Sequence, residues 1–280
     1  MSSATPVIDA VRGGMPSPAG GGVTIDIGEI PIRLEPTDAA FGRTVAERYA
    51  GFVNSAAHPE FEFDVLLENA GRADAEDVRV WKSGSVWKLE RGDFRAEWNP
   101  VSRSGWVRQS ANPYSIDTVL RITHTLVLAE QGGFLVHASS AIRNGRAFLF
   151  AGVSGAGKTT MARLAPADVT LLTDEISYVR RAGAGYRAYG TPFAGELEQP
   201  GENVAASVGG LYLLEKGAEN RIEAVDPATA ARSLLRHILF FARDGRLVKQ
   251  VFASAMEFVS RVSVSKLVFT PDWRAWELIR

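Results

Sequence analysis

A glycine-rich stretch at residues 152–159 constrains the fold of this chain more than any other feature. It reads G-V-S-G-A-G-K-T, which satisfies every position of the phosphate-loop pattern G-x-x-x-x-G-K-[ST]. A β-type run at residues 146–150 precedes it as a strand would, and helix formers follow at residues 161–164. Because strand, loop and helix occur in the required order, we interpret the stretch as a phosphate-binding loop rather than a chance glycine-rich turn.

Each residue type in this stretch has a physical role at a polyphosphate. Glycines let the backbone curl so that successive N–H groups point inward, and the helix that begins near Lys158 adds the positive end of its dipole. The Lys158 ammonium would neutralise β- and γ-phosphate oxygens, and the Thr159 hydroxyl would reach Mg²⁺. The residues predicted to contact the nucleotide are Gly152, Ser154, Gly155, Ala156, Gly157, Lys158, Thr159 and Thr160.

Composition narrows the class of partner. The chain has 280 residues, of which 46% are hydrophobic, enough for a sizeable core, and its formal net charge is −1. Balanced charge gives no general attraction to nucleic acid or to an anionic membrane, so we expect neither as a partner. The sequence has no cysteine, no apolar run long enough to span a membrane and no signal-peptide pattern. These features predict a cytoplasmic location.

Pattern divides the chain into a tail and two domains. Residues 1–22 are rich in Gly, Pro, Ser and Ala and predict a flexible tail. Short alternating segments separated by turn signals predict a β-rich domain over residues 23–108. We expect the tryptophans of that domain to pack within a sheet, with a stacking surface for single-stranded nucleic acid as the alternative. They are Trp81, Trp87, Trp98 and Trp106.

The third segment, residues 109–280, contains the phosphate loop and predicts a mixed α/β fold. Residues 134–142 read as a strand, and Asn144-Gly145 is a hairpin signal, so an antiparallel hairpin delivers the loop. A further apolar strand at residues 169–173 ends in Asp174, sixteen positions after Lys158. A carboxylate at a strand end can hold Mg²⁺ or act as a base, so this spacing predicts one compact reaction unit.

Two predicted helices accompany this unit. The first covers residues 116–131 with Ser115 as its N-cap, and the second begins at Asp226 and continues to residue 241. His124 lies on the first helix, where we interpret it as a packed residue rather than a ligand.

Three stretches resemble the HPr kinase/phosphorylase-like family of serine kinases, which shares a phosphate-loop fold with phosphoenolpyruvate carboxykinase. They are L-V-H-A-S-S-A at residues 135–141, the loop at residues 152–160 and L-L-T-D-E at residues 171–175. The chain looks like the divergent HPr-kinase-related branch, some of whose members serve ribosomal peptide pathways, including lasso peptides. It lacks the E-I-R-G-L-G-I stretch of true HPr kinases, so the resemblance does not extend to HPr as substrate or to the phosphorylase reaction.

The resemblance implies ATP and Mg²⁺ as cofactors and gives roles to four side chains. Asp174 would be the base that accepts the proton of the acceptor hydroxyl, and His137 would tune that base or contact the γ-phosphate. Glu175, which replaces the second Asp of the family, would bind Mg²⁺ with Thr159 or support a residue that does, and Glu196 would add a metal or substrate contact. Alternatively, Asp174 only caps a turn and His137 is a satisfied core residue.

The sequence therefore predicts an ATP-dependent kinase with Asp174, His137 and Lys158 as catalytic residues. Its acceptor would be a Ser or Thr hydroxyl on a peptide or small protein, such as a lasso peptide precursor. A kinase of a small-molecule hydroxyl and a nucleotide-binding regulatory or peptide-binding module are the alternatives. The resemblance also implies a homo-oligomer. An arginine that clamps the transferred phosphoryl group is expected among Arg180, Arg181, Arg187, Arg243 and Arg246.

Overall fold

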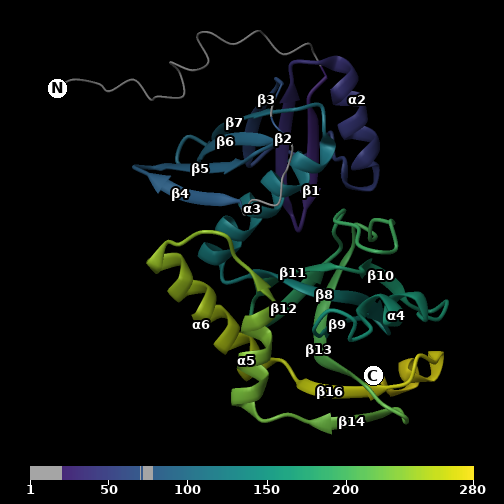
Figure 1. The fold of residues 1–280 in the computed structure, drawn as a ribbon. Helices are drawn as coiled ribbons and strands as arrows, with labels where there is room; N and C mark the ends of the chain where they lie inside the picture. The colour runs from purple at the N-terminus through teal and green to yellow at the C-terminus, as the bar shows by residue number, and fades with distance from the viewer. Residues whose placement is uncertain (1–20, 70, 72–77) are drawn as a thin grey trace. The chain divides into compact units, whose positions relative to one another are not determined.

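A computed structural model of the chain describes residues 21–69, 71 and 78–280. Residues 1–20 of the predicted tail lie outside the described residues. The described chain separates into two compact units (Figure 1). The first contains the residues up to Arg121 together with Phe241–Arg243, and the second contains Ile122–Phe240 and Asp244–Arg280. Because helix α3 (Pro113–Gln131) includes Arg121, the chain passes from one unit to the other within a helix.

In the first unit the described strands form one seven-stranded sheet with the order β1-β2-β3-β7-β6-β5-β4. Strand β3 pairs in parallel with both β2 and β7, whereas the other neighbouring strands are antiparallel. Helix α2 (Ala39–Arg48) packs against β1 and β2, and a 3₁₀ turn (Ala50–Phe52) follows it. The strands are β1 (Val23–Ile27), β2 (Ile30–Pro36), β3 (Phe61–Leu67), β4 (Arg79–Ser83), β5 (Val86–Arg91), β6 (Phe94–Asn99) and β7 (Ser104–Gln109).

Alternation along these strands separates the core face from the outward face. In β2 every second residue is buried, as the period of a half-buried strand requires. Trp87 of β5 lies opposite Trp98 of β6, and both are buried. The ring of Phe61 packs edge-on against that of Trp98, with 5.0 Å between the ring centres. Trp81 follows the buried Val80 and is 42% exposed, and Trp106 is half-buried. Two of the four tryptophans therefore belong to the core, whereas the other two lie on the outward face.

In the second unit the described strands form a nine-stranded mixed sheet. Its helices are α4 (Lys158–Arg163), α5 (Pro227–His237), α6 (Gly245–Arg261) and a 3₁₀ segment (Trp273–Leu278), besides most of α3. The strands are β8 (Phe134–Arg143), β9 (Arg146–Ala151), β10 (Thr170–Thr173), β11 (Ile176–Ala182), β12 (Gly185–Tyr189), β13 (Ala205–Lys216), β14 (Arg221–Ala224), β15 (Ile238–Leu239) and β16 (Val264–Phe269).

The hairpin that delivers the predicted phosphate loop is confirmed. Strands β8 and β9 pair antiparallel, and the turn residues Asn144 and Gly145 have φ angles of 51° and 74°. These left-handed angles are those of the tight turns that suit the twist of a hairpin, which explains why Asn-Gly predicts them.

Five strands of the second unit pair in a closed circuit. Strand β8 pairs with β11, β11 with β12, β12 with β13, β13 with β9, and β9 again with β8. The pairing of β13 with β9 is parallel, whereas the other four pairings are antiparallel. Strand β9, which leads into the loop, is therefore hydrogen-bonded on both edges.

Residues of β9 serve two hydrophobic clusters. Ala147, Leu149 and Ala151 pack in a cluster with residues of α5 and α6. Phe148 and Phe150, which alternate with them, pack in a second cluster with α4, the end of β16 and the C-terminal 3₁₀ segment. Because both faces of β9 are covered, the strand is almost entirely apolar, and the start of the loop is fixed from both sides.

Helix α3 differs from its prediction at its first turn. The predicted N-cap at Ser115 is wrong, because the helix begins at Pro113 and the Asn112 side chain accepts the Tyr114 N–H at 3.1 Å. The Ser115 hydroxyl instead donates to the carboxylate of Asp93 at 2.7 Å. Ser115 therefore makes a tertiary contact with Asp93 instead of capping the helix, as its local sequence had predicted.

Farther along α3, His124 is fully buried, and its Nδ1 lies 3.0 Å from the Tyr178 hydroxyl. Burial, and then the nearby charge of Arg180, lowers the pKa of His124 to about 3, so the imidazole is neutral. It is a packed residue, as predicted.

Helix α5 begins as predicted but ends early. Asp226 is its N-cap and accepts the N–H groups of Ala228 and Thr229. The helix stops at His237 rather than at residue 241, because Ile238 and its neighbour pair with β8 as the short strand β15.

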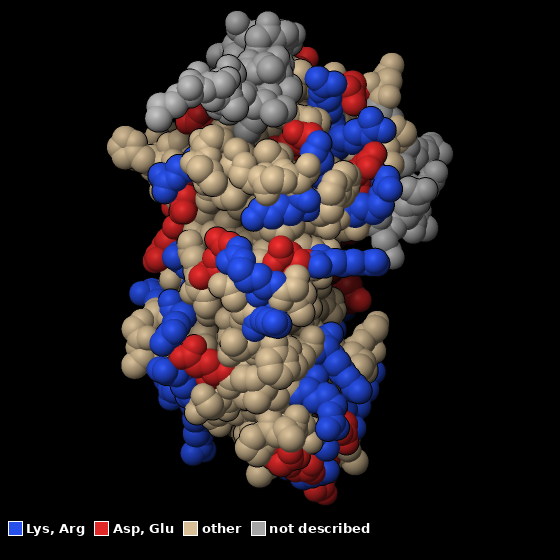
Figure 2. Space-filling model, turned by 90° about the vertical axis from the view of Figure 1, so that its left-hand side faces the viewer, with Lys and Arg blue, Asp and Glu red and all other residues tan. Residues whose placement is uncertain are grey.

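The described residues thus form a mixed α/β protein with two mixed sheets and few helices, in agreement with the predicted class. No helix among them is long and apolar enough to cross a membrane. Figure 2 shows basic and acidic side chains interspersed over the face drawn.

Candidate functional site

The second unit contains a cavity of about 320 Å³ where β9 ends and α4 begins. It brings together His137 of β8, the glycine-rich loop, the acidic pair that follows β10, and Glu196. Gly152 and Ala156, also predicted as phosphate contacts, are buried in the loop and do not line the cavity. The lining residues are His137, Ser154, Gly155, Gly157, Lys158, Thr159, Thr160, Asp174, Glu175, Gly195, Glu196 and Lys216.

Two glycines shape the loop in different ways. Gly155 has a φ of 76°, and a Cβ placed on it would meet nothing within 4 Å. Gly157 has a φ of 109°, and a Cβ there would lie 2.5 Å from the ring of Phe269 at the end of β16. Both conformations suit glycine, but at Gly157 the close approach of an aromatic ring also excludes any side chain.

Lys158 is the first residue of α4 and is only 8% exposed. Its ammonium donates a hydrogen bond to the carbonyl oxygen of Gly152 at 3.0 Å, and its own carbonyl accepts one from Ser139 of β8 at 3.2 Å. Burial lowers the pKa of Lys158, while the nearby carboxylates of Glu175 and Glu196 act in the opposite direction. A bound anion would favour the charged form of this buried amine, which makes the position suited to phosphate oxygens.

Asp174 is almost fully buried and organises the segment that contains Glu196. Its Oδ1 accepts the N–H of Gly195 at 2.8 Å, and its Oδ2 accepts the N–H of Leu197 at 2.9 Å. The hydroxyl oxygen of Thr173 accepts the N–H of the following Glu175 and so fixes the turn after β10. The acidic strand end and the segment around residue 196 are therefore one hydrogen-bonded structure.

His137 is half-buried on β8 and lies in register with Ile176 of β11, two positions after Asp174. This pairing explains why the predicted histidine and the acidic pair line the same cavity. Among the described residues, no group of three or more His, Cys, Asp or Glu side chains could hold a metal ion alone. Glu175 and Glu196 both line the cavity, and their negative charges favour the protonated form of Lys158.

Lys216 is a lining residue that sequence reasoning missed. It is the last residue of β13, which runs parallel to β9 with Leu213 opposite Ala151, so the end of β13 comes close to the start of the loop. No local sequence motif predicts its role, because only the pairing of β13 with β9, two strands distant in sequence, brings Lys216 to the cavity. It gives the cavity a second cation besides Lys158.

None of the five arginines proposed as a phosphoryl clamp is among the lining residues in the described part of the chain. Arg180 and Arg187 lie over the ring of Tyr189, at 5.9 and 5.8 Å from its centre. Arg181 and Arg246 form ion pairs with glutamates.

No curated protein matches the chain. A protein-family model does match, and it is described as the SynChlorMet cassette protein ScmC. The match covers residues 113–280, which is more than half of the chain and includes every residue that lines the cavity. The chain therefore belongs to the ScmC family of SynChlorMet cassette proteins.

Proposed function

We propose that this ScmC-family chain is an ATP-dependent kinase that phosphorylates a Ser or Thr hydroxyl of a peptide or small protein. The observation that carries the proposal is that Lys158, Asp174 and Glu196, from three separate segments, line one cavity. Phosphoryl transfer needs mainly aligned reactants and neutralised charge, which cations and carboxylates around one space can supply. The resemblance to HPr-kinase-like enzymes supports the same reaction and a phosphate-loop kinase core.

The loop residues fit a polyphosphate. Gly155 and Gly157 line the cavity without a side chain that could fill it. The hydroxyl-bearing residues Thr159 and Thr160 line it beside Lys158. Mg²⁺ at such sites is usually held by one or two carboxylates together with substrate phosphates rather than by a protein cage. Thr159, Glu175 and Glu196 are the residues that would hold it. Mg²⁺ would supply charge neutralisation on the phosphates.

The chain's own residues would then divide the chemistry. Asp174 would accept the proton of the acceptor hydroxyl, since each carboxylate oxygen has a second lone pair beyond its backbone hydrogen bond. The hydroxyl oxygen forms a bond to the γ-phosphorus, the bond to the β-γ bridging oxygen breaks, and ADP leaves. Lys158 and Lys216 would hold the phosphate charge, and His137 would orient the base or the γ-phosphate.

Label transfer from γ-labelled ATP tests the proposal. The full chain is incubated with Mg²⁺ and with peptides encoded beside its gene, the natural choice because the family is described as a cassette protein. Lys158→Ala and Asp174→Asn are compared with Lys249→Ala, a control at an exposed residue of α6. We expect Lys158→Ala to weaken ATP binding and Asp174→Asn mainly to lower turnover, with the control unchanged.

Each outcome separates one function from another. Label on a Ser- or Thr-bearing peptide supports the proposal, and label only on a metabolite supports a small-molecule kinase. Tight ATP binding without transfer to any acceptor, equal in wild type and variants, would contradict a kinase and favour a regulatory module.

A further inference from the structure

Four neighbouring strands of the first unit place charged side chains in one row across the outward face of the sheet. Arg79 of β4 lies opposite Glu90 of β5, Glu90 opposite Arg95 of β6, and Arg95 opposite Arg108 of β7. Directly opposed residues of antiparallel strands point to the same face. The row therefore presents three guanidinium groups and one carboxylate side by side.

This row lines a cavity of about 460 Å³, and Arg91 and Glu68 line it as well. Glu90 is shared: one of its oxygens lies 2.8 Å from Arg79 Nη2, and the other lies 3.0 Å from Arg95 Nε. The side chains of Arg79 and Arg95 are 72% and 69% exposed, so they form an open rim. Each keeps further N–H donors that can reach a ligand.

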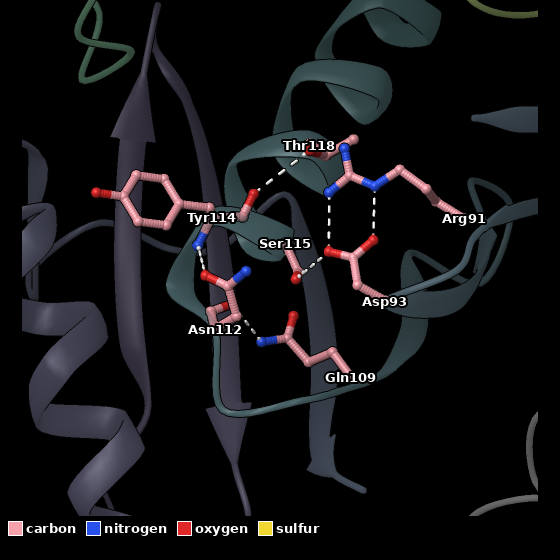
Figure 3. A network of polar contacts seen from close by, with 7 residues as sticks. All are labelled: Arg91, Asp93, Gln109, Asn112, Tyr114, Ser115 and Thr118. Atoms are coloured by element: carbon pink, nitrogen blue, oxygen red, sulfur yellow. Dashed lines mark hydrogen bonds and ion pairs between the residues drawn. The ribbon is translucent and has the colours of Figure 1, made fainter. Parts of the chain in front are cut away.

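Arg91, which also lines the cavity, is fixed in place. Its Nε and Nη2 donate to the two carboxylate oxygens of Asp93 at 2.6 and 2.9 Å, and the Ser115 hydroxyl donates to Asp93 as well (Figure 3). Asp93 is 2% exposed; burial opposes its charge, but the hydrogen bonds from Arg91 and Ser115 hold its pKa below the usual range. The guanidinium of Arg91 is thus oriented before any ligand arrives.

Arg108 is the least satisfied arginine of the cavity. Its Nε is buried and, among the described residues, has no hydrogen-bond partner. Its guanidinium lies 5.3 Å from the centre of the Trp106 ring, which holds its position. Among the described residues, the four lining arginines are accompanied by the lining carboxylates of Glu68 and Glu90 and by Asp93, which pairs with Arg91, so one positive charge is left uncompensated within the described part of the chain. A buried charged donor without a partner calls for one from outside the described chain.

We propose that this cavity binds a carboxylate group of an acidic peptide, with Arg108 as the principal donor and Arg79 and Arg95 at the rim. A planar carboxylate matches the paired N–H groups of a guanidinium. A nucleic-acid strand fits less well, because it brings a phosphate with every nucleotide close to Glu68 and Glu90, whereas a peptide can place one carboxylate at the arginines and direct its other side chains away. Arg79 belongs to β4, the last strand in the order of the described sheet, so a longer peptide can continue past the cavity at that edge.

Fluorescence anisotropy with the full chain tests this site without any enzymatic readout. The probes are a fluorescein-labelled hexaglutamate peptide and its hexaglutamine counterpart. We expect the glutamate peptide to bind at least about tenfold more tightly, since hydrogen bonds to charged groups contribute that much. Arg108→Gln should weaken binding at least about tenfold, and rising salt should weaken it further.

Two further variants keep the result interpretable. Arg95→Gln changes an exposed rim residue and should weaken binding without affecting folding, whereas Arg43→Gln, at an exposed arginine of α2, should leave binding unchanged. Equal binding by wild type, Arg108→Gln and Arg95→Gln would overturn the proposal.

Two competitors identify the ligand chemistry. Displacement by inorganic phosphate at concentrations where acetate is inert would overturn the carboxylate assignment in favour of a phosphate site. Tighter binding of a single-stranded oligonucleotide, lost in Arg108→Gln, would overturn it in favour of nucleic acid. The proposal is supported if phosphate displaces the glutamate peptide no better than acetate does and the oligonucleotide binds no more tightly than that peptide.

Discussion

The carboxylate of Asp174 accepts a hydrogen bond from the backbone N–H of Gly195 at 2.8 Å, and the two residues approach so closely that no side chain fits between them. A Cβ on Gly195 would lie 2.9 Å from the other carboxylate oxygen. Because that oxygen accepts the N–H of Leu197, the acidic strand end determines where Glu196 lies in the cavity. Asp174 is thus both the proposed base and the residue that positions the proposed metal contact.

Asp174→Asn should therefore impair two properties at once. The amide has only one acceptor oxygen, so one of the two N–H groups loses its partner, and the proposed base is removed. We expect turnover to fall by about 10²–10⁴-fold and amide hydrogen exchange at Gly195 or Leu197 to accelerate. Asp168→Asn, at a half-exposed aspartate, is the control. Normal exchange with lost turnover would leave Asp174 a base only, and full turnover would refute that role.

The two loop glycines offer a matched pair of substitutions. Gly155→Ala should cost about 1–2 kcal/mol of unfolding free energy, because only its positive φ is penalised. Gly157→Ala should cost about 2–5 kcal/mol, because its Cβ also overlaps the ring of Phe269. Urea unfolding measures both values. Equal losses would mean that the ring moves aside freely, contrary to a firmly packed loop.

His124 should make the protein sensitive to mild acid. Its pKa is about 3 in the fold against 6.5 for the unperturbed group, so between these values the unfolded state binds a proton that the folded state does not. Stability should therefore fall as pH decreases below about 6.5, by up to about 1.4 kcal/mol per pH unit.

Urea unfolding at several pH values between about 7.5 and 4.5 measures this slope. His124→Gln should reduce the slope of unfolding free energy against pH by up to about 1.4 kcal/mol per pH unit, the contribution of one proton. His58→Gln, at an exposed histidine, is the control and should not reduce the slope. A slope unchanged by His124→Gln would show that the buried imidazole is not the source.

The contact between Ser115 and Asp93 should be worth more than a helix cap. Ser115→Ala removes a hydrogen bond to a buried carboxylate and should cost about 1–3 kcal/mol. Thr118→Ala, one turn farther along the same helix, should change stability by less than about 0.5 kcal/mol. Thermal unfolding followed by circular dichroism distinguishes the two, and similar losses would contradict the tertiary role of Ser115.

Local signals in the sequence predicted the elements that local chemistry determines. Asn144-Gly145 specified a tight turn because its conformation needs no distant partner, and Asp226 specified a helix start for the same reason. Strands such as β3 followed from alternation, since one of their faces is buried. The spacing between Lys158 and Asp174 predicted one compact unit, and both residues line the same cavity.

The features that were missed depend on residues distant in the chain. The local sequence of Ser115 is that of a helix cap, but in the fold Ser115 hydrogen-bonds to Asp93. The local sequence around Ile238 predicts a helix, but in the fold Ile238 pairs with β8. Lys216 reaches the cavity only through the parallel pairing of β13 with β9. The arginine row depends on the register of four strands, which alternation alone does not determine.

Chain order makes the glycine-rich loop depend on residues that the ribosome adds long after it. The loop is complete in sequence at Thr159, but the ring that presses on Gly157 belongs to Phe269. A nascent chain that has not yet delivered β16 therefore carries the whole motif without its final geometry. The nucleotide binding proposed for this loop would then require the C-terminal strand.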